Sequence, residues 1–253
     1  MSKEILLTRR QVIRKTVIAF IQFFVLMSSG VAAWLYIKKL PLDNGLLGGV
    51  QPPIRDVLNA NENVFNKTLS NQHLAKTYPT SMALKKPRVN GDVGIANDFD
   101  PTTWSLNITK KNNKTLSLSL ADIQQLPKTE ICFDFKCIEG WSQITHWGGV
   151  KFSDLMKAYN LGSEAASKYV GMATADYDYY VGLDMTSAMH PQTLLCYEMN
   201  GKPLPIDHGY PLRLIVPVKY GVKSIKRVGE IYFDDARPDD YWFQRGYDYY
   251  LGL

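Results

Sequence analysis

Two cysteines lie close together in the middle of the chain, and one of them stands where chemistry could occur. Cys137 ends an apolar, aromatic run that begins at Ile131, and Gly140 follows three residues later. This pattern predicts a strand that carries a thiol into a turn. A thiolate at this place could act as a nucleophile or bind a soft metal ion. The alternative is a buried cysteine that packs as a small apolar residue, because Cys132 and Cys137 do not form a CxxC motif.

The residues around Cys137 resemble a known enzyme family. The segments KCIEGWS and HWGGVKFSDLM are similar to the cysteine segment of the sulfite-oxidase-type molybdopterin oxidoreductases, in particular the periplasmic methionine-sulfoxide reductase catalytic subunit. Similar segments continue in order over residues 75–250, and the later ones look more like sulfite oxidase: DPTTWSL, LSLSLADIQQLP, NGKPLPIDHGYPLRLIVP, KYGVKSIKRVGEI and YWFQRGYDYY. The resemblance implies that Cys137 is catalytic and binds the metal of a molybdenum–molybdopterin cofactor (Moco), and that Cys132 is structural.

The resemblance also implies a set of residues that hold this cofactor. His208 and Arg213 match a cofactor-contacting histidine and arginine, and Lys223–Lys226 matches a segment whose backbone and lysine hold the cofactor phosphate. The residues alone leave other interpretations open. His208 could be a surface residue in a turn that enters a buried strand, Lys223 and Lys226 could lie in a solvated basic loop, and Thr174 could be an ordinary strand residue. Gly91 replaces a histidine of the family pattern. The implied cofactor-binding residues are Arg88, Asn90, Thr174, His208, Arg213, Ser224, Ile225 and Lys226.

A cluster of tyrosines precedes the segment GLDMTSAMHP. Tyr179 matches a tyrosine that faces the metal-bound oxygen in sulfite oxidases, which implies a catalytic role, and Tyr180 is the alternative. A tyrosine can donate a hydrogen bond while it remains neutral at pH 7. The structural alternative is a strand with one aromatic face.

The residues after Cys137 bear on the substrate. Sulfite oxidases carry a Gly-Asn-Arg-Arg run here, whereas this chain has Glu139 and Trp141. A carboxylate and an indole do not favour a dianion such as sulfite, although His146 could add positive charge. A neutral, amphipathic sulfoxide suits an aromatic pocket better. We therefore expect two-electron oxygen-atom transfer on a small sulfur oxide or sulfoxide, with the substrate itself left open.

The N-terminal part of the chain has the composition of a membrane anchor. Val17–Ile37 comprises 21 residues that are almost all apolar, and as a helix it would span about 31 Å, close to the roughly 30 Å core of a bilayer. Residues 1–40 hold seven Lys or Arg and one acid, which leaves a charge of −1 on the rest. Nucleic-acid binding by the globular part is therefore not expected.

The charges around this apolar run predict its orientation. Five basic residues precede it, so the N-terminus should stay in the cytoplasm. The stretch TRRQVIRK (Thr8–Lys15) resembles a twin-arginine export signal, and the alternative is an ordinary basic flank of an anchor. We expect an uncleaved, single-pass anchor in a bacterial inner membrane, in contact with membrane lipid, and a periplasmic catalytic domain.

The rest of the chain mixes short strands with short helices, which predicts an α+β fold with a mixed sheet. Helices are expected over Ile54–Ser70, Ser119–Pro127 and Phe152–Tyr159. Strands are expected over Asp100–Thr109, Thr115–Leu120, Tyr169–Thr174, Tyr179–Leu183, Leu194–Met199, Leu212–Val216 and Val228–Phe233. The expected domains are an anchor (1–40), a linker with a short helix (41–75) and a bare sulfite-oxidase-type molybdopterin-binding fold (76–253).

An enzyme of this kind needs an electron partner. The sequence has no C-x-x-C-H haem motif, and the anchor would hold the domain at the membrane. We therefore expect a membrane haem protein of the cytochrome b type as the partner, together with a small-molecule substrate. A different interpretation is a non-catalytic accessory subunit of a membrane complex that keeps the molybdopterin fold.

Overall fold

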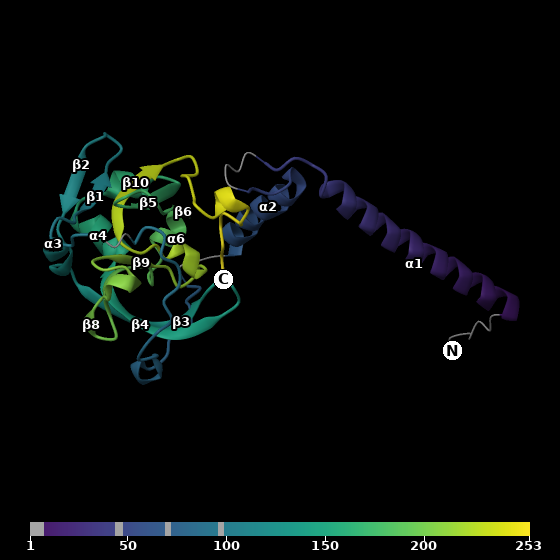
Figure 1. Cartoon of the computed structure of the whole chain (residues 1–253), viewed down its shortest axis with the longest axis horizontal. Helices are drawn as coiled ribbons and strands as arrows, with labels where there is room; N and C mark the ends of the chain where they lie inside the picture. The colour runs from purple at the N-terminus through teal and green to yellow at the C-terminus, as the bar shows by residue number, and fades with distance from the viewer. Residues whose placement is uncertain (1–7, 44–47, 69–71, 96–98) are drawn as a thin grey trace.

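The computed structural model describes residues 8–43, 48–68, 72–95 and 99–253 (Figure 1). Helix α1 (Arg9–Ile37) projects away from the rest of the chain and buries none of its residues. It begins eight residues before the apolar run, because Thr8 caps it and forms a capping box with Gln11. Within the described residues, α1 is the one helix that is long and apolar enough to cross a membrane.

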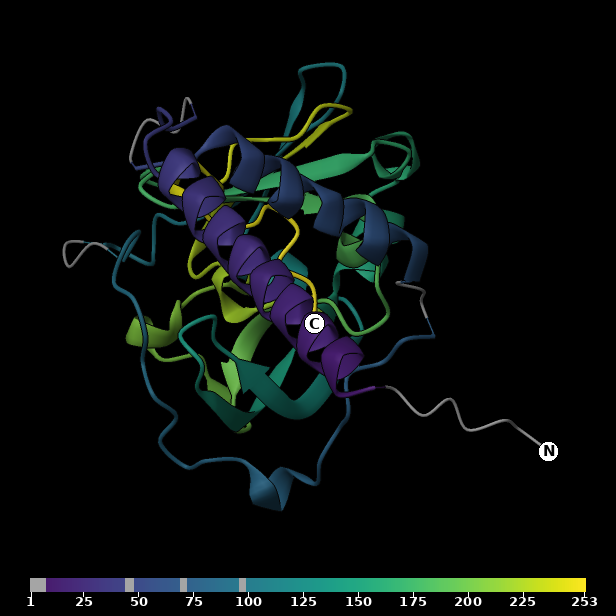
Figure 2. The ribbon, with the colours of Figure 1, turned by 90° about the vertical axis from the view of Figure 1, so that its right-hand side faces the viewer.

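Helix α2 (Pro52–Thr68) packs against the globular part on the side from which α1 projects (Figure 2). Proline at the first helical positions explains its start, since a missing N–H costs nothing there. The prediction of a helix from Ile54 is confirmed, and the predicted end at Ser70 lies outside the described residues.

The first of two five-stranded sheets is mixed, as the sequence predicted. Strand β10 pairs parallel with β1 and antiparallel with β5, and the remaining pairs are antiparallel. Its order is β2 (Thr115–Leu118), β1 (Leu106–Thr109), β10 (Val228–Asp234), β5 (Tyr169–Thr174) and β6 (Tyr180–Asp184). The predicted strand from Asp100 begins only at Leu106, because Asp100 accepts hydrogen bonds from Thr102 and holds a turn.

The second sheet is antiparallel throughout and carries the cysteine. Its strands are β3 (Lys128–Lys136), β4 (Ser142–Lys151), β7 (Leu194–Met199) and β8 (Lys202–Pro203), and β9 (Arg213–Ile215) also pairs with β7. The helices α3 (Leu120–Gln124), α4 (Phe152–Ala158), α5 (Gly162–Ala165) and α6 (Met185–Ala188) are short. Four single turns of 3-10 helix complete the described elements: Thr80–Met82, Ile206–His208, Gly221–Lys223 and Phe243–Arg245.

The two faces of the second sheet belong to different apolar clusters. Along β7, Leu195 and Tyr197 join the main core with the first sheet, whereas Leu194 and Cys196 point to a smaller cluster on the other face. This smaller cluster also contains the aromatic residues Phe135 and Trp147. Its aromatic end forms the floor of the pocket described next.

Candidate active site

Cys137 directly follows β3 and begins a tight turn, as the sequence predicted. Its backbone N–H donates to the carbonyl of Trp141 at 2.9 Å, and the N–H of Gly140 donates back to the carbonyl of Cys137 at 3.1 Å. Gly140 has φ +89°, a conformation that glycine adopts without steric cost. The turn therefore delivers the thiol from the end of a strand into a pocket.

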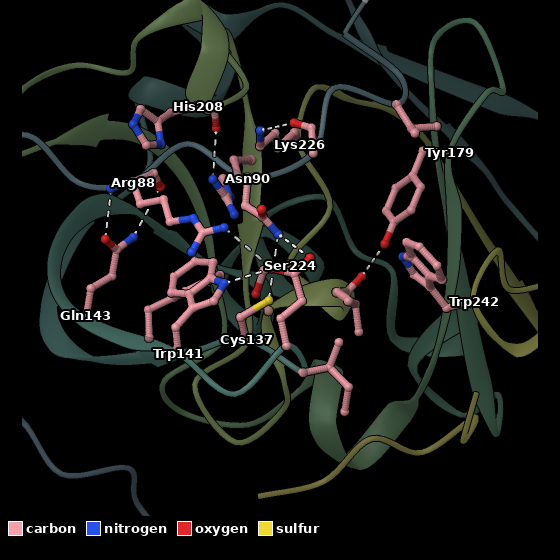
Figure 3. A pocket seen from close by; sticks show the side chains of 18 of the residues that line it. Arg88, Asn90, Cys137, Trp141, Gln143, Tyr179, His208, Ser224, Lys226 and Trp242 are labelled. Carbon is pink, nitrogen blue, oxygen red and sulfur yellow. Dashed lines mark hydrogen bonds and ion pairs between the residues drawn. The ribbon is translucent and has the colours of Figure 1, made fainter. Parts of the chain in front are cut away.

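This pocket brings together eight of the ten residues that the resemblance implied (Figure 3). They come from the turn after β3, from β9, from the loop before β1, from the turn before β6 and from the segments around the short helices at 206–208 and 221–223. The eight residues are Arg88, Asn90, Cys137, Tyr179, His208, Arg213, Ser224 and Lys226. Thr174 and Ile225 do not line the pocket: Thr174 bonds within its own turn, and Ile225 packs in the main core.

The thiol lies in a weakly polar environment. The side-chain amide of Asn90 donates to the sulfur of Cys137 at 3.7 Å. Burial raises the pKa of the Cys137 thiol above its usual value, and the nearby Glu139 carboxylate raises it further, although backbone N–H groups offset part of this effect. The protein alone thus favours the neutral thiol, and a bound cation would favour the thiolate.

Arg213 lies on the pocket side of β9 and is almost fully buried. Its guanidinium lies 4.9 Å from the ring centre of Trp147 and 5.4 Å from that of Phe135, and Nη1 donates to the carbonyl of His208 at 3.2 Å. Its Nε has no hydrogen-bond partner, and within the described residues no carboxylate forms a salt bridge with it. Burial lowers the pKa of Arg213 to about 10, so it is a buried cation that an anion would stabilise.

Two further groups stand beside Arg213. His208 is buried rather than at the surface, and burial together with the Arg213 charge lowers its pKa to about 4, so it is neutral at pH 7. Lys226 donates to the carbonyls of Gly91 at 2.7 Å and Asp207 at 2.9 Å. Both of these acceptors are neutral carbonyls, and no described carboxylate forms a salt bridge with Lys226, although the charges of Asp207 and Asp92 act on it. The ammonium group can therefore also bind an anion.

Tyr179, rather than Tyr180, faces the pocket. Its hydroxyl donates to the carbonyl of Val222 at 2.6 Å, whereas the hydroxyl of Tyr180 bonds to Gln244. Burial raises the pKa of Tyr179, so its hydroxyl stays protonated at neutral pH. Thr174 supports this arrangement from outside the pocket, since its hydroxyl accepts the Tyr179 N–H at 3.2 Å.

Residues at the pocket entrance form a connected polar and aromatic group. The guanidinium of Arg88 lies 4.8 Å from the Trp141 ring centre and 3.7 Å from the Glu139 carboxylate. The indole N–H of Trp141 donates to Glu139 at 2.9 Å. His146 does not add charge here, contrary to our expectation, because it lies on β4 with its Nε2 3.2 Å from Glu130.

Several residues that line the pocket have no functional role among the sequence-based predictions. Trp147 and Phe135 lie on neighbouring strands β4 and β3, and Trp242 and Tyr247 lie in the C-terminal segment. The motif YWFQRGYDYY contained the latter two but no pattern distinguished a pocket residue from a packing residue. Gln143 holds the Arg88 segment by accepting its N–H at 2.8 Å.

One aromatic pocket thus holds a thiol and two cations, Arg213 and Lys226, that form no salt bridge with a described carboxylate. This combination is typical of proteins that bind a cofactor with both a soft metal and an anionic group. The family of the oxidoreductase molybdopterin binding domain matches residues 92–242. The chain therefore belongs to this family of sulfite-oxidase-type molybdopterin oxidoreductases.

Individual relatives agree with this assignment. A putative protein-methionine-sulfoxide reductase subunit YedZ1 of Azospira oryzae is 32% identical over 181 residues, or 71% of this chain and 68% of that protein. The protein-methionine-sulfoxide reductase catalytic subunit MsrP of Campylobacter jejuni is 34% identical over 190 residues, or 69% of this chain and 63% of that protein. The chain thus spans about two thirds of the length of these relatives.

A solved structure shares the fold. The sulfane dehydrogenase SoxCD of Paracoccus pantotrophus superposes with a TM-score of 0.51 at 21% identity. The superposition covers 66% of this chain and 46% of that one. This likeness supports the α+β architecture that the sequence predicted.

The residues of the pocket fit the cofactor of the family. The Cys137 thiol is a donor for a soft metal, and the orphaned Nε of buried Arg213 can donate to an anion. The molybdenum–molybdopterin cofactor, when bound, would supply a metal for two-electron redox chemistry. Cys137 would bind the metal, while Arg213 and Lys226 would hold the anionic part and neutral His208 could hydrogen-bond to it.

We expect cofactor binding to weaken as the pH rises above 8. Burial, aided by the Arg213 charge, lowers the pKa of Lys226 to about 8, so its ammonium is present below this pH and is lost above it. Binding an anion favours the charged form, so the apparent affinity should fall by up to about tenfold per pH unit above 8. Molybdopterin retention on gel filtration between pH 6.5 and 9.5 measures the effect. Lys226→Arg should remove the dependence, and an unchanged slope in that variant would refute the assignment.

Proposed function

We propose that this chain is a membrane-tethered molybdenum enzyme that transfers an oxygen atom to or from a small sulfur oxide or sulfoxide in a two-electron reaction. One observation carries the proposal: the Cys137 thiol and the cations Arg213 and Lys226, which form no salt bridge with a described carboxylate, line one pocket. The thiol suits the metal, and the cations suit the anionic end of the cofactor. The names of the relatives, which refer to methionine sulfoxide, support the sulfur chemistry.

The entrance of the pocket favours a neutral sulfoxide over sulfite. The exposed Glu139 carries a negative charge beside Cys137, and its partners Trp141 and Asn90 lower its pKa further. Arg88 faces Glu139 at 3.7 Å, so its positive charge is already partly compensated. Trp141 and Trp242 provide apolar faces for the methyl groups of a sulfoxide.

A neutral sulfoxide gains two electrons and two protons and yields a sulfide and water. In this reaction the chain binds and orients the substrate between aromatic side chains. The Tyr179 hydroxyl, protonated at neutral pH, is positioned to donate a hydrogen bond into the pocket when its bond to Val222 is released.

The substrate assignment is tested with the cofactor-loaded chain and two small molecules. We expect reduction of a neutral methyl sulfoxide by a reduced viologen dye, and sulfite oxidation that is at least about a hundredfold less efficient, since repulsion of a dianion costs several kcal/mol. Glu139→Gln should make the efficiencies of sulfoxide reduction and sulfite oxidation more similar, because it removes the negative charge and keeps the shape of the side chain. Faster turnover of sulfite than of the sulfoxide in the wild-type chain would contradict the assignment.

We further propose that α1 spans a bacterial inner membrane once, with its N-terminus in the cytoplasm and the catalytic domain in the periplasm. None of its 29 residues is buried, and a helix lying flat on a membrane would need a marked polar face, which α1 lacks. A membrane haem protein of the cytochrome b type is the proposed electron partner. The tether would hold the pocket near such a partner.

This topology predicts that a protease added to intact spheroplasts digests the domain. The reason is that everything after Lys38 would lie outside the cytoplasm. If the twin-arginine route exports the protein, replacing both Arg9 and Arg10 by lysine should trap cofactor-loaded protein in the cytoplasm. Cleavage of the wild-type domain only after lysis would show that the orientation is wrong.

A further inference from the structure

The helix before the matched family region contacts a turn that forms part of the pocket. Arg55 on α2 is almost fully buried although it is charged. Its Nη1 donates to the carbonyl of Tyr247 at 2.8 Å, and its Nη2 donates to the carbonyl of Phe243 at 2.9 Å. The guanidinium also lies 4.0 Å from the Phe243 ring centre. Arg55 therefore holds both ends of the turn over residues 243–247.

This turn carries two aromatic residues of the pocket. Trp242 and Tyr247 both line the pocket, and their rings pack edge to face with their centres 5.1 Å apart. The N–H of Tyr247 donates to the carbonyl of Trp242 at 3.0 Å, which closes the turn. In Figure 3, Trp242 and Tyr179 lie on the side of the pocket across from Trp141 and Cys137. The position of the turn therefore sets the width of the aromatic pocket.

A third donor fixes the direction of the Arg55 side chain. Its Nε donates to the carboxylate of Asp43 at 2.5 Å, and the other oxygen of Asp43 accepts the N–H of Val50 at 3.0 Å. Three acceptors, two in the turn over residues 243–247 and one on Asp43, thus use three directions of one planar guanidinium. A lysine would keep the charge but could not reach all three acceptors, because its N–H groups all lie on one nitrogen rather than on a planar fork.

The geometry points to Arg55 as a positioning residue for the substrate-binding wall formed by Trp242 and Tyr247. The segment before residue 92 then belongs to the architecture of the pocket and is more than a linker to the membrane anchor. Arg55 touches neither cofactor nor substrate, and it acts through the turn that it holds. The kinetic part of this inference rests on the proposed oxygen-atom transfer, whereas the structural part does not.

Arg237 supplies a matched control. It also joins α2 to the domain, since it donates to Asn59 at 2.8 Å and pairs with Glu62, and it has the same charge. No hydrogen bond or ring contact joins its described side chain to the turn over residues 243–247. Arg237→Ala should therefore loosen α2 without releasing the aromatic wall directly.

The test uses the full-length, cofactor-loaded protein and two readouts. Hydrogen exchange of the Gly246 and Tyr247 amides should be about tenfold faster or more in Arg55→Ala and Arg55→Lys, and near the wild-type rate in Arg237→Ala. Molybdenum content should stay the same in all of them. The Michaelis constant for a neutral methyl sulfoxide should rise about tenfold in the Arg55 variants, with kcat within about twofold.

Each result decides the inference. Wild-type exchange rates in both Arg55 variants would overturn it, and so would an equal increase in Arg237→Ala, which would indicate general loosening of α2. Faster exchange with an unchanged Michaelis constant would overturn the role in substrate binding. If Arg55→Ala does not fold, Arg55→Lys still gives both readouts. If the wild-type chain does not turn over, the proposed function fails while the exchange rates still test the role of Arg55.

Discussion

Replacing Cys137 with serine is expected to abolish turnover and the thiolate-to-metal charge-transfer absorption while the fold stays intact. Cys137 is the cysteine that lines the pocket, and its backbone turn does not depend on the sulfur. A serine hydroxyl is a hard, weakly acidic group that replaces a soft thiolate poorly as a metal ligand. Loss of activity to background, with circular dichroism and melting temperature near those of the wild type, is the predicted result.

Cys132 provides the matched control for this experiment. It lies on β3, five residues before Cys137, and its sulfur contacts the carbonyl of Pro79 at 3.6 Å rather than the pocket. Cys132→Ser should keep both the absorption and the turnover. Activity that survives in Cys137→Ser would contradict the whole assignment, because no other cysteine lines the described pocket.

Replacing Arg213 with alanine should weaken cofactor binding about ten- to a hundredfold. A charge-assisted contact to an anion is worth about 1.5–3 kcal/mol, which corresponds to this range of affinity. The loss should come without a partner charge left unpaired, since no described carboxylate forms a salt bridge with Arg213. Molybdopterin and molybdenum per purified chain, measured after dilution, report the affinity.

Two further variants make the Arg213 result specific. Arg213→Lys should fall between wild type and alanine, because it keeps the charge and loses the planar fork. Lys128→Ala removes the same charge from the same sheet, where Lys128 pairs with Glu198, and should leave cofactor content unchanged. Full cofactor content in Arg213→Ala, together with a raised Michaelis constant alone, would assign Arg213 to the substrate instead.

The local features of the site could be predicted because short motifs carry them. The strand and turn around Cys137 follow from an apolar run that ends before a glycine, and the structure has both. His208, Arg213 and Lys226 came from the resemblance and meet in the pocket. From the residues alone, His208 at the surface is the simpler interpretation. It is wrong because His208 is buried, with the ring of Trp147, distant in sequence, packed edge to face against it.

Features that depend on contacts between distant segments could not be predicted. The Trp147 ring contacts the Arg213 guanidinium because their strands, β4 and β9, both pair with β7. The sequence pattern does not predict how these strands align. Thr174 matched a family position near the pterin, but here its hydroxyl is engaged within the turn that ends at Tyr179. Each of these outcomes depends on the tertiary packing around one side chain.

The N-terminal segment illustrates the same limit. The sequence predicts a linker with a short helix over residues 41–75. The corresponding helix α2 has 17 residues with an apolar and a polar side, a pattern that indicates packing on a protein surface. In the structure its described buried residues, Arg55 and Glu62, are charged. Polar groups also join it to the domain, since Asn61 donates to Asp248 at 2.9 Å and Glu62 accepts from Tyr169 at 2.6 Å. Partners for such groups come from the C-terminal segment and the first sheet, 187 and 107 residues away along the chain.

Molybdenum content of the purified full-length chain tests the central claim most directly. The protein should be made in a host that synthesises molybdopterin and analysed by elemental analysis together with Cys137→Ser. We predict about one molybdenum per wild-type chain, since one thiol ligand lines the described pocket. The serine variant should fall far below this value. Wild-type protein that contains no molybdenum under these conditions would contradict the account and would favour a non-catalytic accessory subunit that retains the fold.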